Sequence, residues 1–337
     1  MNELIKEFVL KHMGNTPSGA EVGLEALDDA AVIDDIVLKS DSHAVRPIFF
    51  PGGDIGRLAI SGTVNDISCL GAEPIALACG FVLEEGLPLT DFDRILVSMR
   101  KACDDACAYV ITGDTKVVEK GSLGGCVINV SGIGRRTKAL EHNIAVVRQL
   151  APSFKGRWLL DSNVKAGQKI ILSGTIGDHG LAVLSAQQGL SFGSSIVSDV
   201  TPLNKLVQQL LQVGGIVALK DPTRGGLANA LNEWSEKSHT GILIYEDKVP
   251  IRQDVKAACE MLGIDPLEVG NEGKLIIGVV KEKADELLAE LRGTKEGKEA
   301  QIIGEATKQF SQVAMQTSIG GKRIISTPIG DPIPRIC

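Results

Sequence analysis

The chain has 337 residues, of which 44% are hydrophobic and 23% are charged, so it can bury a substantial core and is long enough for two domains. Its formal net charge of -7 argues against a broad basic surface for nucleic acid, and a small acidic ligand would need a metal ion as an intermediary. The longest apolar runs are far shorter than the roughly 20 residues that a membrane span requires, which predicts no membrane segment.

The first part of the chain is expected to alternate strands with helices. The opening MNELIKEFVLKHMG carries Leu4, Ile5, Phe8 and Val9 on one stripe, which predicts an amphipathic helix rather than a signal peptide, and therefore a cytoplasmic location. DDAAVIDDIVLKSDS predicts two short strands joined by a turn. GGDIGRLAISGTVNDISCLGA is expected to be helical after its glycines, and PIALACGFVLE is expected to be a buried strand.

A second helix and two more strands should complete the first domain. Thr90 is expected to cap a helix that turns one apolar face inward. That face consists of Phe92, Ile95, Leu96, Met99 and Cys103. AYVITGDT and GCVINVSGIG predict strands, after which the pattern weakens between residues 135 and 167.

The second half repeats this α/β character. Helices are predicted at about residues 204–212, 225–237 and 282–292, and strands at GILIY, GKLIIGVV and AQIIGEAT. We therefore expect an α/β protein with an N-terminal domain at residues 1–155, a C-terminal α/β domain at residues 156–326 and a flexible tail at residues 327–337.

The seven cysteines form an odd set and predict no disulfide framework. Five of them are expected to be buried reduced thiols because their surroundings are apolar: Cys69, Cys79, Cys103, Cys126 and Cys259. Cys103 and Cys107 lie four residues apart, which could bind a metal, although core packing is the more frequent reason for such a pair. Cys337 ends the chain behind prolines that disfavour a helix, either by chance or as a carrier thiol on an extended arm.

Acidic residues recur where strands end and turns begin. They are Asp28, Asp29, Asp41, Asp66, Asp114, Asp178 and Asp221. Each taken alone is more often a cap or a turn former than a ligand. Several short carboxylates that meet at loop ends would suit Mg²⁺, which prefers oxygen ligands and commonly bridges carboxylates to nucleotide phosphates. As a set they predict a magnesium site whose ligands are Asp29, Asp41, Asp66, Asp114 and Asp221.

Polar groups beside glycines add candidates for the chemistry. TRGG at residues 223–226 offers a cation and backbone N–H groups at a helix start, where an anion would bind, or it is a routine glycine turn. GDHG places His179 at another helix start, in either a structural or a catalytic role. Glu272 in NEGK is either a general base or part of a charged turn. Lys116, directly after GDT, either neutralises phosphate charge or faces solvent.

Nine segments in order carry a family resemblance. They are DDAAVI, SDS, FFPGGDIGRLAISGTVNDISCLGAEP, CGFVLEEGLP, ITGDTKVV, SGTIGDHG, DPTRGG, NEGKLIIGV and PRIC. Together they resemble the HypE family of hydrogenase maturation factors, over nearly the whole chain. The first elements are shared with the wider aminoimidazole ribonucleotide synthetase superfamily, whereas GDTKVV and the terminal cysteine are typical of this branch.

The resemblance implies a PurM-like fold in a homodimer. The N-terminal mixed sheets of two subunits would pair into an intersubunit barrel, with ATP and Mg²⁺ near the interface and a C-terminal α/β domain on each subunit. It implies nucleotide binding by Asp28, Asp29, Asp41, Asn65, Asp66, Gly113, Asp114, Thr115, Asp178, Thr223, Arg224, Gly225 and Asn271. The family usually opens with a glycine-rich GSGG segment, whereas this chain starts with MNELIKEF, so less cover of the nucleotide phosphates is expected.

The resemblance also implies an activity. In this family the carbamoyltransferase HypF places a carbamoyl group on the C-terminal cysteine, ATP drives its dehydration to a thiocyanate, and the HypC and HypD complex accepts the cyanide for the Fe(CN)2CO unit of nickel-iron hydrogenases. Cys337 would carry the substrate, Glu272 would be the base, Lys116 would orient the carbamoyl oxygen or the phosphate, and His179 would assist.

Two other functions remain open at this stage. One is another ATP-using enzyme of the same superfamily, such as a selenophosphate-synthetase-like phosphotransferase, which needs no carrier thiol at its end. The other is a noncatalytic metal carrier or scaffold that holds iron or nickel through Cys337. A single thiol and scattered histidines make a poor site for a soft metal, which disfavours this second function.

Overall fold

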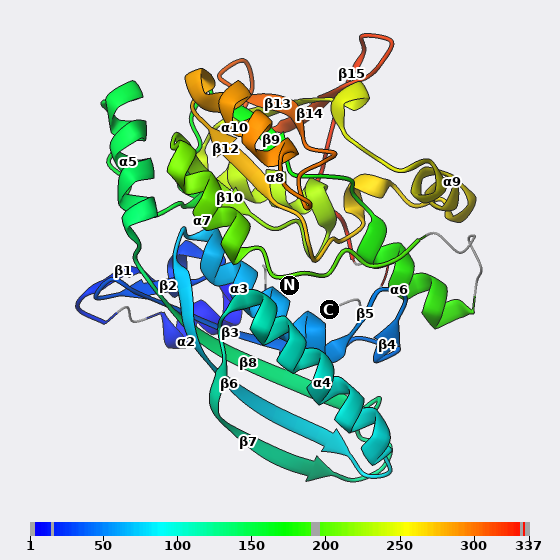
Figure 1. Ribbon diagram of the computed structural model, residues 1–337. Helices are drawn as coiled ribbons and strands as arrows, with labels where there is room; N and C mark the ends of the chain where they lie inside the picture. Colours follow the sequence, from blue (N-terminus) through cyan, green and yellow to red (C-terminus); the bar gives the residue numbers. More distant parts are fainter. Residues whose placement is uncertain (1–3, 15–16, 190–195, 331–332, 334–337) are drawn as a thin grey trace.

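Two β-sheets, one from each half of the chain, organise the molecule (Figure 1). The structure is a computed structural model that describes residues 4–14, 17–189, 196–330 and 333. In Figure 1 the N-terminal sheet occupies the lower half and the C-terminal sheet the upper half. None of the helices in these described residues combines the length and the apolar character needed to cross a membrane.

The N-terminal sheet is mixed. Its described strands are β1 (Ala20–Val22), β2 (Ala31–Ile33), β3 (Ile36–His43), β6 (Glu73–Glu84), β7 (Val110–Val118) and β8 (Cys126–Arg135). They lie in the order β1-β2-β3-β8-β6-β7, with β6 and β7 parallel and every other neighbouring pair antiparallel. Asp34 and Asp35, both at positive φ, make the predicted turn between β2 and β3.

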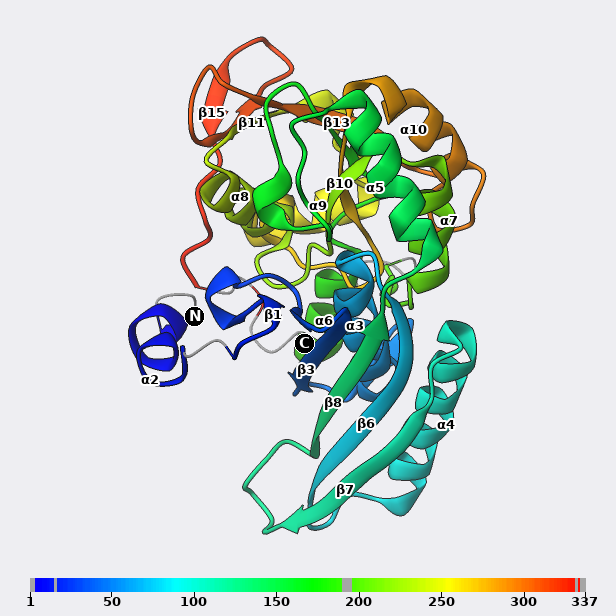
Figure 2. The same cartoon turned by 90° about the vertical axis from the view of Figure 1, so that its left-hand side faces the viewer.

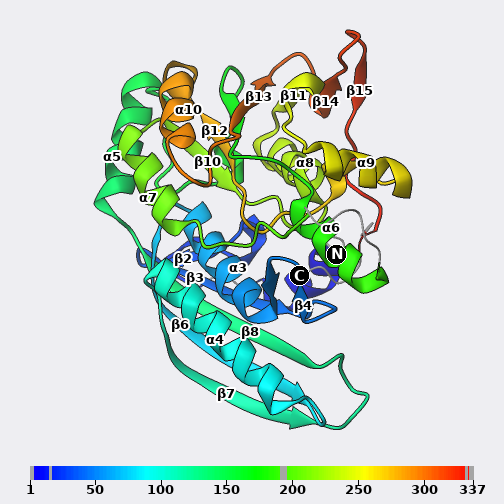
Figure 3. The same cartoon turned by 45° about the vertical axis from the view of Figure 1, so that its right-hand side comes forward.

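Helices α3 (Ile55–Cys69) and α4 (Leu89–Ala106) cover one face of this sheet (Figure 3). The predicted helix after the glycines is confirmed as α3. The side chain of Asp54 caps it by accepting hydrogen bonds from the amides of Gly56 and Arg57, at 2.8 and 3.0 Å. At Gly62 a Cβ atom would lie 2.8 Å from His43 Nε2, so this glycine lets α3 approach β3 closely.

The C-terminal sheet follows the order β10-β12-β9-β13-β11-β14-β15. Its strands are β9 (Lys169–Leu172), β10 (Ile216–Lys220), β11 (Gly241–Tyr245), β12 (Ile276–Val279), β13 (Gln301–Thr307), β14 (Val313–Gln316) and β15 (Lys322–Ile324). The helices of this half are α6 (Asp178–Gln188), α7 (Asn204–Val213), α8 (Gly226–Ser238), α9 (Gln253–Leu262) and α10 (Ala284–Arg292). Short elements elsewhere are α2 (Leu10–Met13), β4 (Phe49–Phe50) and β5 (Gly53–Asp54).

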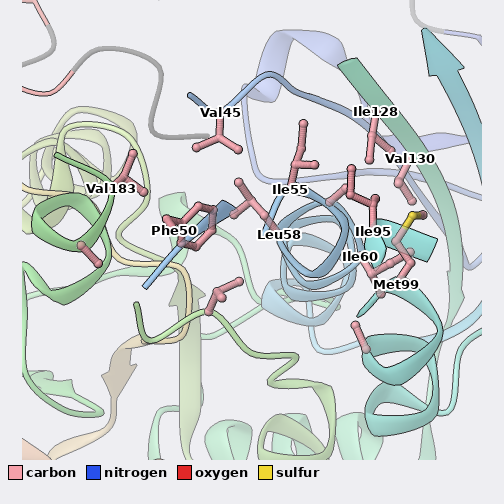
Figure 4. Packing of buried hydrophobic residues seen from close by; sticks show 14 of the residues in the cluster. Val45, Phe50, Ile55, Leu58, Ile60, Ile95, Met99, Ile128, Val130 and Val183 are labelled. Atoms are coloured by element: carbon pink, nitrogen blue, oxygen red, sulfur yellow. The ribbon is translucent and has the colours of Figure 1, made fainter. Parts of the chain in front are cut away.

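One hydrophobic cluster crosses from the first half to the second. Figure 4 labels part of it, namely Val45, Phe50, Ile55, Leu58, Ile60, Ile95, Met99, Ile128, Val130 and Val183. Val183 comes from α6, whereas most of the other labelled residues belong to α3, α4 and β8. Burial of shared apolar surface therefore holds the two halves together.

The segment between residues 135 and 167 is more regular than the sequence suggested, because helix α5 spans Lys138–Leu150. Thr137 caps it by accepting a hydrogen bond from the amide of Leu140, at 3.1 Å. Leu140, Ile144 and Val147 are buried one turn apart. The sequence contains this cap and this apolar stripe, so the helix could have been predicted. Its apolar pattern is weaker than that of the strands before and after it.

Three other local predictions were wrong. Helix α4 begins at Leu89 after Pro88, with no side-chain cap, so Thr90 lies inside it. Leu96 is exposed because it falls beside the stripe of Ile95 and Met99 rather than on it. Strand β6 is half-buried rather than buried, since it has a helix on one face only.

The N-terminal amphipathic helix is confirmed as a helix, but its apolar stripe is not buried. Residues Ile5–Val9 form a π-helical turn that leads into α2, and Leu4 and Phe8 stay 59% and 62% exposed. Periodicity predicted the helix, but it carried no information on whether a partner covers the stripe.

Strand β7 is exposed over nearly its whole length. It ends the sheet order, so it has a hydrogen-bonded neighbour on one side only among the described strands (Figure 2). Ile111 and Val117 are 73% and 64% exposed. A long apolar strand with an open edge is a template for pairing with another strand.

We predict that Asp54→Ala lowers the free energy of unfolding by about 1 kcal/mol, because two amides at the start of α3 lose their acceptor. Urea or thermal unfolding followed by circular dichroism measures the change. Asp93→Ala, at an exposed position within α4, is the control and should leave stability nearly unchanged. Equal stability of the two variants would contradict the role of the cap.

Candidate active site

A cavity of about 1110 Å³ lies between the two halves of the chain. Strand β3 and helix α3 supply one wall, and the loop after β10, the start of α8 and the chain beyond β15 supply the other. The structure brings these predicted residues to its lining: Asp28, Asp29, Asp41, Asp66, Asp221, Thr223, Arg224, Gly225 and Glu272. These residues come from segments up to about 250 positions apart and meet only in the folded chain.

The side chains of β3 point alternately to the two faces of the sheet, and one set of them forms a wall of the cavity. Lys39, Asp41 and His43 share the face of the strand that turns toward α3, because side chains two residues apart point the same way. Lys39 Nζ lies 2.7 Å from Asp66 Oδ2 on α3. His43 Nε2 lies 3.5 Å from Asp41 Oδ2. Lys39 was not among the predicted site residues, although its period-two spacing from Asp41 was a usable signal.

A buried lysine ties the opposite wall together. Lys220 ends strand β10 and is only 5% exposed. Its Nζ lies 2.5 Å from Asp29 Oδ1, 3.2 Å from Asp161 Oδ2 and 3.0 Å from Glu233 Oε2. Asp161 also pairs with Lys237, at 2.6 Å. This network positions Asp29 from the first half against β10 from the second.

Lys220, Asp161 and Glu233 were also missed by the sequence analysis. The signal for Lys220 was a charged residue that ends the otherwise apolar strand IVALK, directly before Asp221. Nothing in the sequence pointed to Asp161 or Glu233, because each is defined by a partner far along the chain.

Two buried carboxylates on the cavity lining each have an oxygen without a hydrogen-bond partner among the described residues. They are Asp221, through Oδ2, and Glu272, through Oε1. Burial, and then the charges of nearby carboxylates, raise the pKa of both groups well above their usual range. The same causes raise the pKa of Asp66 to about 7, although Lys39 opposes them. The site therefore holds more acidic groups than its lysines neutralise.

This arrangement fits a divalent cation. Mg²⁺ takes hard oxygen ligands, and an ion placed among these carboxylates would satisfy the unpaired oxygen of Asp221 and relieve its repulsion with Asp29 and Asp66. Of the predicted metal ligands, Asp29, Asp41, Asp66 and Asp221 line the one cavity. Asp114 does not line it.

A second buried network fixes the position of Glu272. The Glu272 amide donates to Asp199 Oδ1 at 3.1 Å, and Asn271 Nδ2 donates to Asp199 Oδ2 at 2.9 Å. Asn271 Oδ1 accepts a hydrogen bond from the Gly177 amide at 2.9 Å. Lys274 Nζ lies 3.0 Å from Asp199 Oδ2. Asp199, which the sequence analysis missed, thus holds the loop that presents Glu272.

Four predicted residues are absent from the lining of the cavity, namely Asn65, Asp178, His179 and Asn271. Asn65 donates to the carbonyl oxygen of Thr201 at 3.1 Å and therefore joins α3 to the second half. The carboxylate of Asp178 accepts a hydrogen bond from Thr175 Oγ1 at 2.6 Å. His179 is fully buried, with its Nδ1 2.8 Å from Ser198 Oγ. In this chain the side chains of these residues contact other protein groups.

Strand β7 carries the other predicted residues, and in a single chain it keeps them away from the cavity. They are Gly113, Asp114, Thr115 and Lys116. All four residues are exposed. They lie away from the cavity because β8 and β6 separate β7 from β3 in the sheet. The spacing of GDTK along the sequence could not reveal this separation.

The C-terminal segment enters the cavity from the second half. Residues 327–330 form part of its lining. Ile333 is 1% exposed, and a Cβ atom on Gly180 would lie 3.2 Å from its Cδ1 and 2.6 Å from Val269 Cγ1. Cys337 lies outside the described residues, but four residues beyond Ile333 span at most roughly 14 Å. Chain length therefore permits the proposed use of Cys337 at this cavity.

The predicted reduced state of the cysteines is confirmed for the residues that the structure describes. Cys69, Cys79, Cys103, Cys126 and Cys259 are buried and free. Cys107 is exposed at the end of α4, so it does not share the buried position of Cys103 and the two form no metal pair.

We predict that Asp221→Asn stabilises the metal-free and nucleotide-free protein at about pH 8 but changes little at about pH 5. The folded state raises the pKa of Asp221, so this group stabilises the fold at low pH and loses that contribution as the pH rises. Urea midpoints at the two pH values measure the effect, with Asp93→Asn on α4 as the surface control. A larger gain at low pH would contradict the proposed repulsion.

Comparison with known proteins gives the site its context. The model of the N-terminal domain of AIR synthase related proteins matches residues 27–136, and that of their C-terminal domain matches residues 165–315. Carbamoyl dehydratase HypE of Azotobacter vinelandii is 45% identical over 304 residues, which span 90% of this chain and 84% of that protein.

Solved structures agree with this match. A HypE in complex with ATP is 41% identical, with a TM-score of 0.82 over 100% of this chain and 96% of that one. The HypE chain of a HypE-HypF complex is 42% identical, with a TM-score of 0.86 over 96% of this chain and 99% of that one. This chain therefore belongs to the HypE family of hydrogenase maturation proteins, with the two-domain α/β fold of the AIR synthase related proteins.

Proposed function

We propose that this protein is an ATP-dependent carbamoyl dehydratase that converts a thiocarboxamide on Cys337 into a thiocyanate. The observation that carries this proposal is that the C-terminal segment lines a cavity whose buried carboxylates are not fully neutralised. The carbamoyl dehydratase named among the relatives and the ATP complex of a similar chain support it. The product would supply cyanide ligands to the Fe(CN)2CO centre of nickel-iron hydrogenases.

The chemistry needs the oxygen of the carbamoyl group to leave. Oxide and hydroxide are poor leaving groups, so the carbamoyl oxygen would attack the γ-phosphate of ATP and release ADP. The C–O bond of the resulting phosphate ester then breaks, phosphate departs, and the nitrogen loses its protons as the nitrile forms. No oxidation state changes in this sequence.

Side chains on two sides of the cavity would bind Mg-ATP. Asp29, Asp41, Asp66 and Asp221 would hold Mg²⁺. The ion would offset the negative charge of the phosphates. Arg224 and the start of α8 lie on the same cavity and present a cation and a helix N-terminus to the phosphates. Asp28 and residues 223–225 complete the proposed nucleotide contacts.

Glu272 is the candidate for the base that accepts protons from the carbamoyl nitrogen. Glu272 lines the cavity, its Oε1 has no protein partner among the described residues, and the Asp199 network holds its backbone in place. Burial raises the pKa of Glu272, which strengthens it as a proton acceptor. His179 is surrounded by protein groups, so its role would be to support the packing near the tail.

The substrate and product have to move between proteins. A HypF, which forms a complex with a similar HypE chain, is the proposed carbamoyl donor. The HypC and HypD complex is the proposed cyanide acceptor. Since Ile333 is buried near the cavity, the tail would have to leave this position to present Cys337 to either partner. The free thiols fit a reducing compartment, so we place the protein in the cytoplasm.

A homodimer would complete the site. The open edge of β7 and its exposed apolar residues are suited to pairing with β7 of a second copy, which would extend the two sheets into one barrel. Asp114 and Lys116 lie on this strand, so pairing would bring them to the interface near ATP. In that position Lys116 could orient the phosphate, which a single chain does not allow.

We predict that the C-terminal peptide loses the mass of one water when carbamoylated protein is incubated with Mg-ATP. Mass spectrometry of the peptide measures this change. Cys337→Ala should carry neither adduct, and Glu272→Gln should accumulate the carbamoyl form and slow dehydration by about 100-fold or more, the usual contribution of a general base.

Cys107→Ala is the matched control, because Cys107 is the other cysteine outside the buried set and should not affect either adduct. An adduct that maps to Cys107 would overturn the assignment of Cys337. Dehydration at the normal rate in Glu272→Gln would remove Glu272 as the base.

We also predict that Ile111→Lys weakens self-association by on the order of tenfold or more, because a charge on the open edge opposes strand pairing. Analytical ultracentrifugation measures the dissociation constant. Val97→Lys on α4 is a control of similar exposure, 64% against 73%, and should have little effect. If both variants weaken the dimer equally, the interface does not lie along β7.

A further inference from the structure

Cys69 lies beside the acidic cavity, and the proposed function gives it no role. It is the last residue of α3, fully buried, and one turn beyond Asp66. Its Sγ and one carboxylate oxygen each of Asp29 and Asp221 lie within 4.8 Å of one another. Within the described part of the chain, this is the group of cysteine, histidine and acidic side chains whose spacing suits a metal ion.

The unpaired oxygen of Asp221 independently points to a ligand at this position. Asp221 is 4% exposed, and its Oδ2 has no hydrogen-bond partner among the described residues. A buried carboxylate oxygen without a partner is unfavourable unless an ion or a donor satisfies it. Lys220 Nζ pairs directly with Asp29, at 2.5 Å, whereas Asp221 Oδ2 accepts no hydrogen bond from the described residues.

We propose that Asp29, Cys69 and Asp221 form a binding site for a thiophilic divalent cation of the Zn²⁺ and Cd²⁺ class. Zn²⁺ binds sulfur at about 2.3 Å and carboxylate oxygen at about 2.1 Å, so a tetrahedral ion would place these ligand atoms roughly 3.6 Å apart. Side-chain shifts of about 1 Å would close the present spacing to that value. The Cys69 thiol releases its proton to solvent as the sulfur–metal bond forms, and no electrons are transferred.

This site would distinguish between cations by the type of ligand atom. Mg²⁺ prefers oxygen and gains little from a thiol, whereas Zn²⁺ and Cd²⁺ bind thiolate strongly. Because Asp29 and Asp221 belong to both sets, a thiophilic ion on Cys69 would compete with Mg²⁺ for the cavity. The cation site stands on the three side chains alone, and only this competition rests on the proposed function.

Cd²⁺ titration of the full chain tests the site, because the cadmium–thiolate bond gives an ultraviolet charge-transfer band. The titration uses a Cys107→Ser, Cys337→Ser background, which removes the exposed thiol and the tail thiol, and contains no nucleotide or carbamoyl donor. In this background we expect a band that saturates at one Cd²⁺ per chain. Adding Cys69→Ser should abolish the band and weaken Cd²⁺ binding by roughly tenfold or more in equilibrium dialysis.

Cys126→Ser in the same background is the matched control, since Cys126 is buried in the hydrophobic core and should leave the band intact. Asp221→Asn should weaken Cd²⁺ binding while every thiol of the background is retained. Thermal unfolding by circular dichroism confirms that each variant is folded, and Cys69→Ala replaces Cys69→Ser if the latter is not.

A band that persists in both Cys69 variants, or that disappears in Cys126→Ser, would overturn the site. An unchanged Cd²⁺ titration in excess Mg²⁺ would overturn the shared ligands. Since these measurements need no dehydration, failure of the proposed function would leave the expected band in place. Absence of the band in this background, when the protein that retains Cys337 does dehydrate its tail, would refute this inference alone.

Discussion

Two lysines, Lys39 half-buried and Lys220 buried, allow two domains to share one acidic cavity. Lys39 pairs with Asp66 inside the first half, and Lys220 from the second half pairs with Asp29 from the first. Without these cations, carboxylates brought together by folding would be too costly to bury as charged groups. Removing either lysine would leave an acid of the site without its cation, and the Lys220–Asp29 pair both joins the two halves and lines the cavity.

The lysines do not pair with every carboxylate of the cavity, since Asp221 and Glu272 each keep an oxygen without a hydrogen-bond partner among the described residues. Their repulsion lowers the stability of the empty protein at neutral pH, and a cation that enters the cavity recovers that loss. This is a common relation between stability and function: a site that is ready to bind charge is less stable until the charge is bound. The thiol of Cys69 adds a soft ligand to an otherwise hard set, which makes the choice of cation a property of this particular chain.

The proposed reaction would use three separate parts of the fold: the cavity, the C-terminal tail and strand β7. The proposed reaction would take place in the cavity bounded by both halves, and Cys337 would carry the substrate between this cavity and a partner. Strand β7 lies at the edge of the sheet, so the proposed roles of Asp114 and Lys116 would require a second copy of the chain. One chain therefore holds the carboxylates and the carrier, and the dimer would supply Asp114 and Lys116.

Local patterns in the sequence determined the elements and the chemistry of the site. Alternating and 3.6-residue periodicities located β3, α3, β8 and α7, because those patterns depend on neighbours along the chain. The recurring acids predicted Asp29, Asp66 and Asp221, which line the cavity, although Asp66 lies within α3 rather than at a strand end. Only the tertiary structure decided that Lys220 neutralises Asp29, that His179 is enclosed by protein and that Lys116 lies at a distant edge. Each of these depends on a partner that the chain brings near only by folding, and no spacing along the sequence encodes that distance.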